Sequence, residues 1–595
     1  MVLTNITNQE MSVSMDKNVI RLQDCMKTYT TDQDKAITPE ETIAKFKDKL
    51  DHLDIDILKE VKRIDNGRLG IPVYFSVCGE DAKAMTGTKK QMGKGASAIQ
   101  AKASACMELA ERFSFFTFKN NPDNFIEGDY QQMRDLGYPV LDTRYLLQSV
   151  HDEKSNAEFL EQILQGIPMQ WTWATNLTSG EDILMPFSWF FAINEFNGPS
   201  AGNSYEEAAL QGVCEIVERH VCAVVNHGEI KTPLIDPLSV KDPVSVKLIT
   251  IFKEHGIDLY LNDFTLDTGI CTVSALAIDR STFPEKSEIV YTAGTTSDPE
   301  KALIRAVTEV AQLAGDFNSG SNYVASGLPK PLSMDEVDHV AKSGMTVKME
   351  DLVDLSDNNI RIEVENCVAA LANIGMDTFM LDVAHPELKI PAIYTIVPGA
   401  HFRERSMIKD VGLFASKLLV ERVTDPELLD ERLARLERLI PEAYYLDFYR
   451  GRNLYESGQP EAALLQFKKA LELTPEQEDL PYIHSFMGNC YRDLGNYEEA
   501  LVILQKGLEE DEERSDIHNT MGVCFFKLEE YAKAVKSFER AVELNPVSAM
   551  DYANLGVNHR KLGNNEQAIN FLTLALSLDP DIEFAQKQLT ELFTA

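Results

Sequence analysis

Two segments of this 595-residue chain carry the same pattern of acidic and basic residues. The pattern Glu-x-x-Glu-Arg occupies positions 108–112 and again 215–219, and a glycine, Gly95 or Gly202, stands 13 residues before its first glutamate. In an α-helix, residues three and four positions apart share a face, so each segment would present two carboxylates and one guanidinium together. These matched segments are therefore the first candidates for a functional site.

A third segment, over 299–314, places Arg305, Glu309 and Gln312 on one helical face as well. A single motif of this kind in an acidic chain ordinarily marks a solvated helix face with an i,i+4 ion pair. Here, however, the rest of the first two helices is small and apolar, which is typical of helices packed on most sides. Buried carboxylates need cations or metal ions beside them. Four glutamates and three arginines therefore indicate a site where Mg²⁺ bridges phosphate oxygens and guanidinium groups bind the phosphates of a nucleotide.

The glycine-rich stretch over 87–95 does not supply a phosphate-binding P-loop. It has five residues between its first two glycines instead of four, and Gly95 stands where a Ser or Thr should hold Mg²⁺. Gly93 and Gly95 are better explained as the turn that leads into the following helix. We therefore expect nucleotide binding without a P-loop.

Between about 31 and 415 the sequence alternates β-rich runs with long helical patterns. The clearest strands are predicted over 71–77, 271–279 and 392–399, and the clearest helices over 96–119, 204–225 and 299–314. This alternation of strand and helix patterns predicts one α+β domain with a substantial hydrophobic core.

The last part of the chain repeats itself with a period of 34 residues. Gly488, Gly522 and Gly556 mark three copies of one unit, and an earlier copy over 460–475 differs by a three-residue insertion. The units resemble tetratricopeptide repeats, about four of them within 443–595, which implies an all-α solenoid of stacked helix pairs. Repeats of this kind ordinarily hold a peptide or a protein partner.

Two further segments complete the predicted organisation. Residues 416–442 form a charged amphipathic pattern that we interpret as a helical linker between the α+β domain and the repeats. Residues 1–30 are polar and are predicted to be a disordered tail.

The composition excludes several classes of protein. The formal charge is −37, which disfavours a nucleic-acid-binding face but leaves room for a local cationic pocket that binds a small anion. No apolar run approaches the roughly 18 residues that span a bilayer, and the first residues do not resemble a signal peptide, so we expect a cytoplasmic protein without a membrane span. None of the nine cysteines forms a C-x-x-C pair, which disfavours a zinc site or a disulfide framework and favours core positions.

With these motifs in place, residues 35–402 resemble the YcaO-type ATP-utilising proteins. The resemblance extends to the strand over 69–73, to R-A-x-T-E-x-x-Q over 305–312 and to the Val-Pro-Gly over 397–399. It implies a YcaO-type catalytic domain that uses ATP and Mg²⁺ to phosphorylate a peptide-backbone amide oxygen while a nucleophile attacks the amide carbon. An internal side chain would give an azoline (cyclodehydratase chemistry) and delivered sulfide a thioamide, and one branch of the family is linked to methylthiolation of a ribosomal protein.

The resemblance also implies roles for individual residues. The Mg²⁺ ligands, and with them the catalytic residues, would be Glu108, Glu215, Glu218 and Glu309. The phosphates would be contacted by Arg112, Arg219 and Arg305, and the nucleotide by Glu111 and Asn203. Lys35 and Thr42 fit the family's early nucleotide-binding pair, although the same short stretch also fits an ordinary helix N-terminus with a surface lysine.

The chain departs from the family pattern where the domain ends. It continues into repeats instead of a proline-rich tail, and it carries no fused ubiquitin-activating-like or TfuA-type domain. We therefore expect an ATP-dependent enzyme acting on a peptide or protein, with a separate TfuA-like, sulfur-delivery or ubiquitin-activating-like partner and with repeats that recruit the substrate. The alternative is a non-catalytic ATP-binding adaptor or assembly factor. Thioamide and azoline chemistry both stay open, as does a homodimer built through the repeats.

Overall fold

In the computed structural model the chain divides into two compact units, Met1–Val411 and Gly412–Ala595. The structure describes residues 19–65, 67–281, 283, 289–313, 331, 333–402, 410–545 and 548–594. The division falls four residues before the predicted end of the α+β domain at 415.

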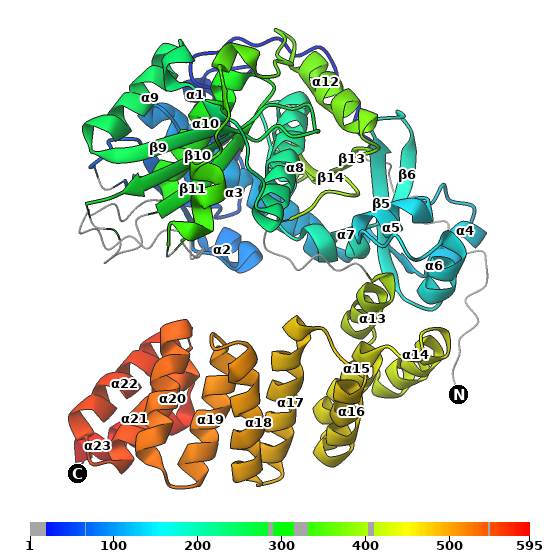
Figure 1. Ribbon diagram of the computed structural model, residues 1–595, viewed down its shortest axis with the longest axis vertical. Helices are drawn as coiled ribbons and strands as arrows, with labels where there is room; N and C mark the ends of the chain where they lie inside the picture. Colours follow the sequence, from blue (N-terminus) through cyan, green and yellow to red (C-terminus); the bar gives the residue numbers. More distant parts are fainter. Residues whose placement is uncertain are drawn as a thin grey trace. The chain divides into compact units, whose positions relative to one another are not determined.

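Among its described residues the first unit contains three sheets, and Figure 1 labels strands of the second and third. The first has the order β1 (Leu58–Arg63), β2 (Val73–Cys78), β3 (Lys90–Lys94). The second has the order β11 (Ile289–Thr295), β10 (Thr272–Asp279), β9 (Ile257–Asp263), β8 (Leu234–Ile235), β12 (Thr346–Val347). The third has the order β4 (Ile126–Gly128), β5 (Met169–Asn176), β13 (Phe379–Asp382), β14 (Ala392–Ile396), β7 (Pro199–Ala201), with β6 (Asp182–Pro186) paired to β5. Neighbouring strands are antiparallel except β8 and β12.

Helices cover these sheets. Those of the first unit are α1 (Pro39–Asp51), α2 (Glu80–Thr86), α3 (Ala98–Asn120), α4 (Tyr130–Asp135), α5 (Thr143–Ser149), α6 (Ala157–Leu164), α7 (Phe187–Asn194), α8 (Tyr205–Gly228), α9 (Pro243–Glu254), α10 (Pro299–Leu313), α11 (Asp338–Ala341) and α12 (Ile360–Asn373). Short 3₁₀ turns lie at Pro122–Asn124, Pro237–Ser239, Asp335–Val337 and Met349–Asp351. The predicted α+β class is confirmed, and the three strongest predicted strands correspond to β2, β10 and β14.

The three long helices predicted to carry the site are α3, α8 and α10, and each packs on a different part of the sheets. Helix α3 lies against β2 and β3, and α8 against β14 and β7. Helix α10 lies against β10 and β11 (Figure 1). Ser97 and Ser204 begin α3 and α8 as N-caps, each accepting a backbone N–H from the first turn. A Cβ at Gly93 would collide with the backbone of Ala101, so a glycine there allows β3 to lie directly on α3.

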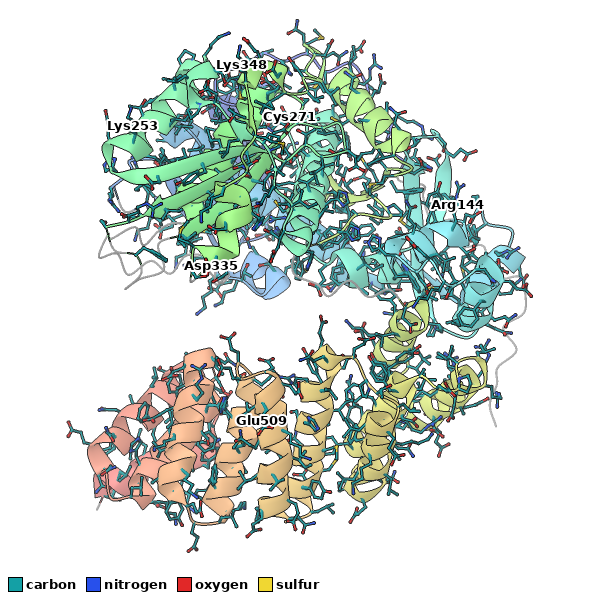
Figure 2. All side chains as sticks on the ribbon, in the orientation of Figure 1. Arg144, Lys253, Cys271, Asp335, Lys348 and Glu509 are labelled. Atoms are coloured by element: carbon teal, nitrogen blue, oxygen red, sulfur yellow. The ribbon has the colours of Figure 1, made fainter. Side chains whose placement is uncertain are left out.

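Apolar side chains form the cores of this unit. Cys271, directly before β10, is fully buried in the core between the second sheet and α10, whereas Arg144 and Lys253 lie at the periphery (Figure 2). Of the nine cysteines, seven are buried and all are free thiols, as predicted for core positions. None of the described helices is long and apolar enough to cross a membrane.

The prediction of a disordered tail over residues 1–30 is wrong for residues 19–30. Residues 1–18 lie outside the described residues, but residues 19–30 run along the first unit, where Met26 forms a β-bridge with Asn359 and the backbone N–H of Ile20 donates to Thr175. No local pattern indicates this, because the partners lie more than 150 residues away and the segment itself has no periodicity.

The second unit is entirely helical. Its elements are α13 (Val411–Arg422), α14 (Pro426–Leu439), α15 (Tyr444–Glu456), α16 (Pro460–Glu472), a 3₁₀ turn (Gln477–Asp479), α17 (Leu480–Asp493), α18 (Tyr497–Glu510), α19 (Ser515–Lys527), α20 (Tyr531–Leu544), α21 (Ala549–Lys561), α22 (Asn565–Leu578) and α23 (Glu583–Thr594). From α15 to α22 the helices pack in consecutive pairs, as the 34-residue period predicts. The repeated glycines allow this: a Cβ at Gly522 would collide with the ring of Phe538 on the paired helix.

The predicted linker over 416–442 is better described as part of this helical unit. Helix α14 packs against α15 and buries Leu429, Leu433 and Leu436 along one face. Arg450 on α15 reaches back to Asp430 and Glu437 with nitrogen–oxygen distances of 3.1 and 3.2 Å. The leucine spacing of three and four residues, present in the sequence, is the signal that this helix needs a partner.

Candidate nucleotide site

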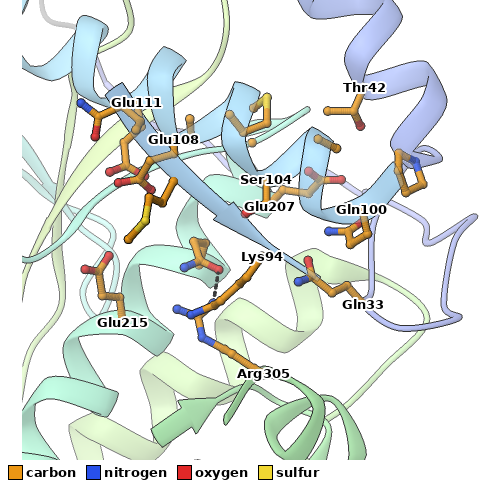
Figure 3. Close-up of a pocket in the computed structure, with 18 of the residues that line it drawn as sticks. Gln33, Thr42, Lys94, Gln100, Ser104, Glu108, Glu111, Glu207, Glu215 and Arg305 are labelled. Atoms are coloured by element: carbon orange, nitrogen blue, oxygen red, sulfur yellow. Dashed lines mark hydrogen bonds between the residues drawn. The ribbon is translucent and has the colours of Figure 1, made fainter. Parts of the chain in front are cut away.

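The residues predicted to bind a nucleotide meet in one cavity of the first unit, with a volume of about 490 Å³. The predicted residues among its lining are Lys35, Thr42, Glu108, Glu111, Arg112, Asn203, Glu215, Glu218, Arg219, Arg305 and Glu309. In Figure 3, Glu108, Glu111 and Glu215 face one end of the cavity, and Gln33, Thr42 and Gln100 lie at the other. The structure thus brings the predicted set together, although their roles as ligands stay predictions.

Helix α3 contributes two carboxylates and a guanidinium that are already paired. Nε of Arg112 donates to Oε1 of Glu108 at 3.1 Å and lies 3.3 Å from Oε1 of Glu111. An Nη1 hydrogen of Arg112 is donated to the backbone carbonyl of Phe196 at 3.4 Å. These contacts fix the guanidinium at the wall of the cavity.

Helices α8 and α10 meet through a second ion pair. Arg305 donates from Nε to Glu218 at 3.0 Å and from Nη1 to the side-chain oxygen of Gln211 at 2.8 Å. Glu218 also accepts the backbone N–H of Thr295 at 3.2 Å. Arg219, by contrast, leaves 41% of its side chain exposed and is 4.0 Å from Glu215. It is therefore the guanidinium most open to an incoming anion.

Burial and neighbouring charges shift the pKa values of these carboxylates in different directions. Burial, and then the nearby Glu108, raises the pKa of Glu111 well above its usual range. Burial also raises the pKa of Glu215, even though Arg219 and Arg112 oppose it. Burial also favours a higher pKa for Glu218, but the positive charges of Arg305 and Arg219 have the larger effect, so the pKa of Glu218 is lowered. A cation placed near Glu215 would relieve the cost of burying its charge.

A lysine that the sequence analysis did not assign also reaches the cavity. Lys94, at the end of β3, pairs with Glu309 of α10. Burial, and then the positive charges of Arg305 and Arg219, nevertheless lower the pKa of Lys94 to about 7. The sequence feature that could have revealed Lys94 is the Gly-Lys-Gly just before α3. This stretch is not a P-loop, but it brings a cation to the site.

A buried carboxylate was missed as well. Glu207 lies on the cavity face of α8, two turns before Glu215, and accepts hydrogen bonds from the backbone N–H and the side chain of Asn203, each at 2.9 Å. Its spacing from Gln211 and Glu215 in steps of four could have revealed it. Asn203 is thus held in place by α8 itself.

Comparison with known proteins identifies the first unit. The model of the family described as YcaO cyclodehydratase, ATP- and Mg²⁺-binding, matches residues 92–401, which is more than half of the chain. The chain belongs to the YcaO family. Its cofactors are therefore ATP and Mg²⁺, and the family description supports an enzymatic role. Tetratricopeptide-repeat models match residues 454–524, 515–546 and 552–582 of the second unit.

Two relatives match this chain over most of their own length. An uncharacterized protein of Methanothermobacter thermautotrophicus is 27% identical over 61% of this chain and 94% of its own length. A protein of Rhizobium leguminosarum bv. trifolii, named as an uncharacterized protein in the tfuA 3′ region, is 24% identical over 62% of this chain and 88% of its own. A solved heterocyclase in complex with substrate and cofactor is 22% identical with a TM-score of 0.51; the match covers 64% of this chain and only 54% of the heterocyclase. It shows the fold.

The side chains of the YcaO domain fit ATP and Mg²⁺. Carboxylate oxygens are the ligands that Mg²⁺ prefers, and guanidinium forks match phosphate oxygens. Among the described residues, no three His, Cys, Asp or Glu side chains are grouped closely enough to share a metal ion. Instead, the four predicted ligands each lie beside a cation: Glu108 by Arg112, Glu215 by Arg219, Glu218 by Arg305 and Glu309 by Lys94. A nucleotide phosphate would compete for these cations and leave the carboxylates to the metal.

Proposed function

We propose that this protein activates a backbone amide of a peptide or protein at the expense of ATP, giving a thioamide or an azoline. The observation that carries the proposal is the meeting of α3, α8 and α10 around one cavity lined by paired carboxylates and guanidinium groups. When bound, ATP with Mg²⁺ supplies the phosphoryl group that converts an amide oxygen into a leaving group. Membership of a family described as cyclodehydratase supports this chemistry over simple nucleotide storage.

The residues of the cavity have distinct tasks in this proposal. Glu108, Glu215, Glu218 and Glu309 hold Mg²⁺, and the guanidinium of Arg219, whose side chain is 41% exposed, binds phosphate. Arg305 and Arg112, which pair with Glu218 and Glu108 before the nucleotide binds, then contact phosphate oxygens and place positive charge where negative charge increases during transfer. Asn203, fixed by Glu207, and the pair Lys35 and Thr42 contact the rest of the nucleotide.

We further propose a separate protein partner and a role for the repeats in binding the substrate. One relative is named for its position in a tfuA 3′ region, which favours a TfuA-like partner over the other candidate classes. The repeat unit contains the paired helices by which such repeats hold peptides or partner proteins. A thioamide product with a TfuA-like partner and a role in ribosomal-protein methylthiolation are finer versions of the same proposal.

The test is to incubate the purified chain with ATP, Mg²⁺ and candidate peptides encoded near its gene, with and without the neighbouring protein. We expect phosphate release together with a modified peptide. Mass spectrometry separates the products, because an azoline has lost one water and a thioamide has exchanged oxygen for sulfur. ATP binding without phosphate release or peptide modification in every combination would favour the non-catalytic adaptor.

A further inference from the structure

Residues 19–37, which we call the N-terminal strap, lie against the beginnings of all three helices that carry the site. At α3, the N-cap Ser97 donates its hydroxyl hydrogen to Asp32 of the strap at 3.3 Å. At α8, Glu207 accepts the backbone N–H of Ala36 at 2.6 Å. The strap therefore touches the same turn of α8 that holds Asn203.

The contact with α10 is made through a buried lysine. Lys301, in the first turn of α10, donates from Nζ to the backbone carbonyls of Thr30 and Thr31 at 2.9 and 3.1 Å. It lies one turn before Arg305 on the same helix. The strap and the phosphate-binding part of α10 are thus joined by a single rigid turn.

A buried ion triad fastens the middle of the strap. Nζ of Lys27 is 2.6 Å from Asp34 and 2.7 Å from Glu363 of α12, and the side chains of Lys27 and Glu363 are 5% and 0% exposed. Glu363 also accepts the hydroxyl hydrogen of Ser297, just before α10, at 2.7 Å. Removing the lysine would leave two carboxylates facing one another without a cation, which is strongly unfavourable in a buried place.

We propose that Lys27 is a positioning residue for the nucleotide site, which it affects through the strap without contacting the nucleotide. The inference rests on the proposed nucleotide site. Gln33, Lys35 and Ile37 of the strap line the cavity directly, so releasing the strap opens one wall while loosening the beginnings of α3, α8 and α10. Binding is reciprocal: a nucleotide that needs the strap in place must also hold it there.

The first experiment is calorimetric titration of the full chain with Mg²⁺ and AMPPCP, a non-hydrolysable ATP analogue. We expect Lys27→Met to raise Kd by at least about tenfold, with the stoichiometry of binding unchanged. The matched control is Arg21→Met on the same strap; Arg21 makes an ion pair with Asp182 but leaves 54% of its side chain exposed, so Kd should change by less than about twofold. A misfolded fraction would lower the stoichiometry and leave Kd unchanged, which separates loss of fold from loss of positioning.

A second variant and a second readout cover the case in which Lys27→Met does not fold. Asp34→Asn keeps the shape of the triad and removes one charge, and we expect it to raise Kd by about threefold or more. Hydrogen exchange in the unaltered chain should slow at the amides of Gln23 and Ala36, which are bonded to Glu206 and Glu207, when Mg²⁺ and AMPPCP are added.

Three results would overturn the proposal. The first is that folded Lys27→Met and Asp34→Asn proteins bind Mg²⁺–AMPPCP as tightly as the unaltered chain. The second is that Arg21→Met raises the Kd as much as Lys27→Met does. The third is hydrogen exchange in the strap that is indifferent to the nucleotide analogue. If the unaltered chain itself binds no Mg²⁺–AMPPCP, the nucleotide site is wrong and the strap inference falls with it, which distinguishes the two failures.

Discussion

Arg219 and Arg305 face the same cavity but differ in how far their side chains are exposed, 41% for Arg219 and 16% for Arg305. Arg305 is bound by Glu218 and Gln211, whereas Arg219 leaves much of its side chain exposed beside Glu215. The guanidinium of an arginine can donate hydrogen bonds to two phosphate oxygens at once, whereas the ammonium of a lysine acts as a point charge. At the scale of single residues, Arg219 should therefore contribute to binding through its geometry as well as its charge.

We predict that Arg219→Lys weakens binding of Mg²⁺–AMPPCP by about tenfold while the charge of the site is unchanged, because loss of one charge-assisted hydrogen bond costs about 1.5 kcal/mol. Calorimetric titration checks this. The control is Arg134→Lys, which alters an exposed ion pair with Glu161 outside the cavity. Equal affinity for Arg219→Lys and the unaltered chain would mean that Arg219 is a structural partner of Glu215.

The elements of the site could be predicted from the sequence to very different degrees. Helices α3, α8 and α10 were predicted because the spacing of their charged and small apolar residues specifies them locally. Apart from Lys35, the strap over 19–37 was not predicted as part of the site, and neither was the carboxylate of Glu207, because their roles depend on partners far away in the chain. Local pattern identifies an element that buries its own face, but it cannot identify an extended segment held by other elements.

The close packing of β3 on α3 gives a prediction at the scale of elements. Gly93→Ala should lower the free energy of unfolding by about 1–3 kcal/mol, because the new Cβ collides with helix backbone, which cannot move aside. Urea unfolding followed by circular dichroism measures the change. Gly228→Ala is the matched control, since its Cβ meets only the flexible side chain of Ile230, and it should stay within about 1 kcal/mol of the unaltered chain. If the two variants have the same free energy of unfolding, the space between β3 and α3 can accommodate a Cβ at position 93.

Three histidines of the repeat helices predict that the stability of the second unit depends on pH. Burial lowers the pKa of His484 on α17, His518 on α19 and His559 on α21. A histidine whose pKa is lower in the folded state than its unfolded value near 6.5 stabilises the fold above that pH, and the stabilisation is lost as the pH falls below it. We therefore expect residues 412–595 to lose stability from pH 7 to pH 5, by up to about 1.4 kcal/mol per pH unit for each proton taken up.

Urea unfolding of residues 412–595 at the two pH values, with His484→Asn as the comparison, checks this expectation. The variant should show a shallower loss of stability on acidification, because it removes one buried group that must be protonated on unfolding. A pH dependence that is the same in the variant and the unaltered unit would assign the effect to other groups.

At the scale of the whole molecule, the two units differ in how they hold together. The first unit has sheet-based cores with contacts between distant segments, whereas in the second each repeat packs mainly on the next. Helix α14 belongs to the second unit because its leucines are covered by α15. The position at which the chain is shortened therefore decides whether the remaining part is stable.

We predict that a chain ending at Val411 stays soluble and binds Mg²⁺–AMPPCP with the affinity of the full chain, because every cavity residue lies before 313. A chain ending at Pro441 should aggregate more, since Leu429, Leu433 and Leu436 lose their cover. Light scattering and calorimetry compare the two. Equal solubility of both shortened chains would contradict the placement of α14 in the helical unit.

The cavity between α3, α8 and α10 is the proposed place where this YcaO protein uses ATP, and Glu215→Gln is the sharpest test of that proposal. The change is isosteric and removes one negative charge from the predicted Mg²⁺ site. Mg²⁺-dependent release of phosphate from ATP is measured for this variant, for the unaltered chain and for Glu365→Gln, a control on the exposed face of α12. We expect Glu215→Gln to lose at least about 100-fold in rate with an unchanged circular dichroism spectrum, and the control to keep its activity. If Glu215→Gln released phosphate at the rate of the unaltered chain, the cavity would not be the site of ATP use.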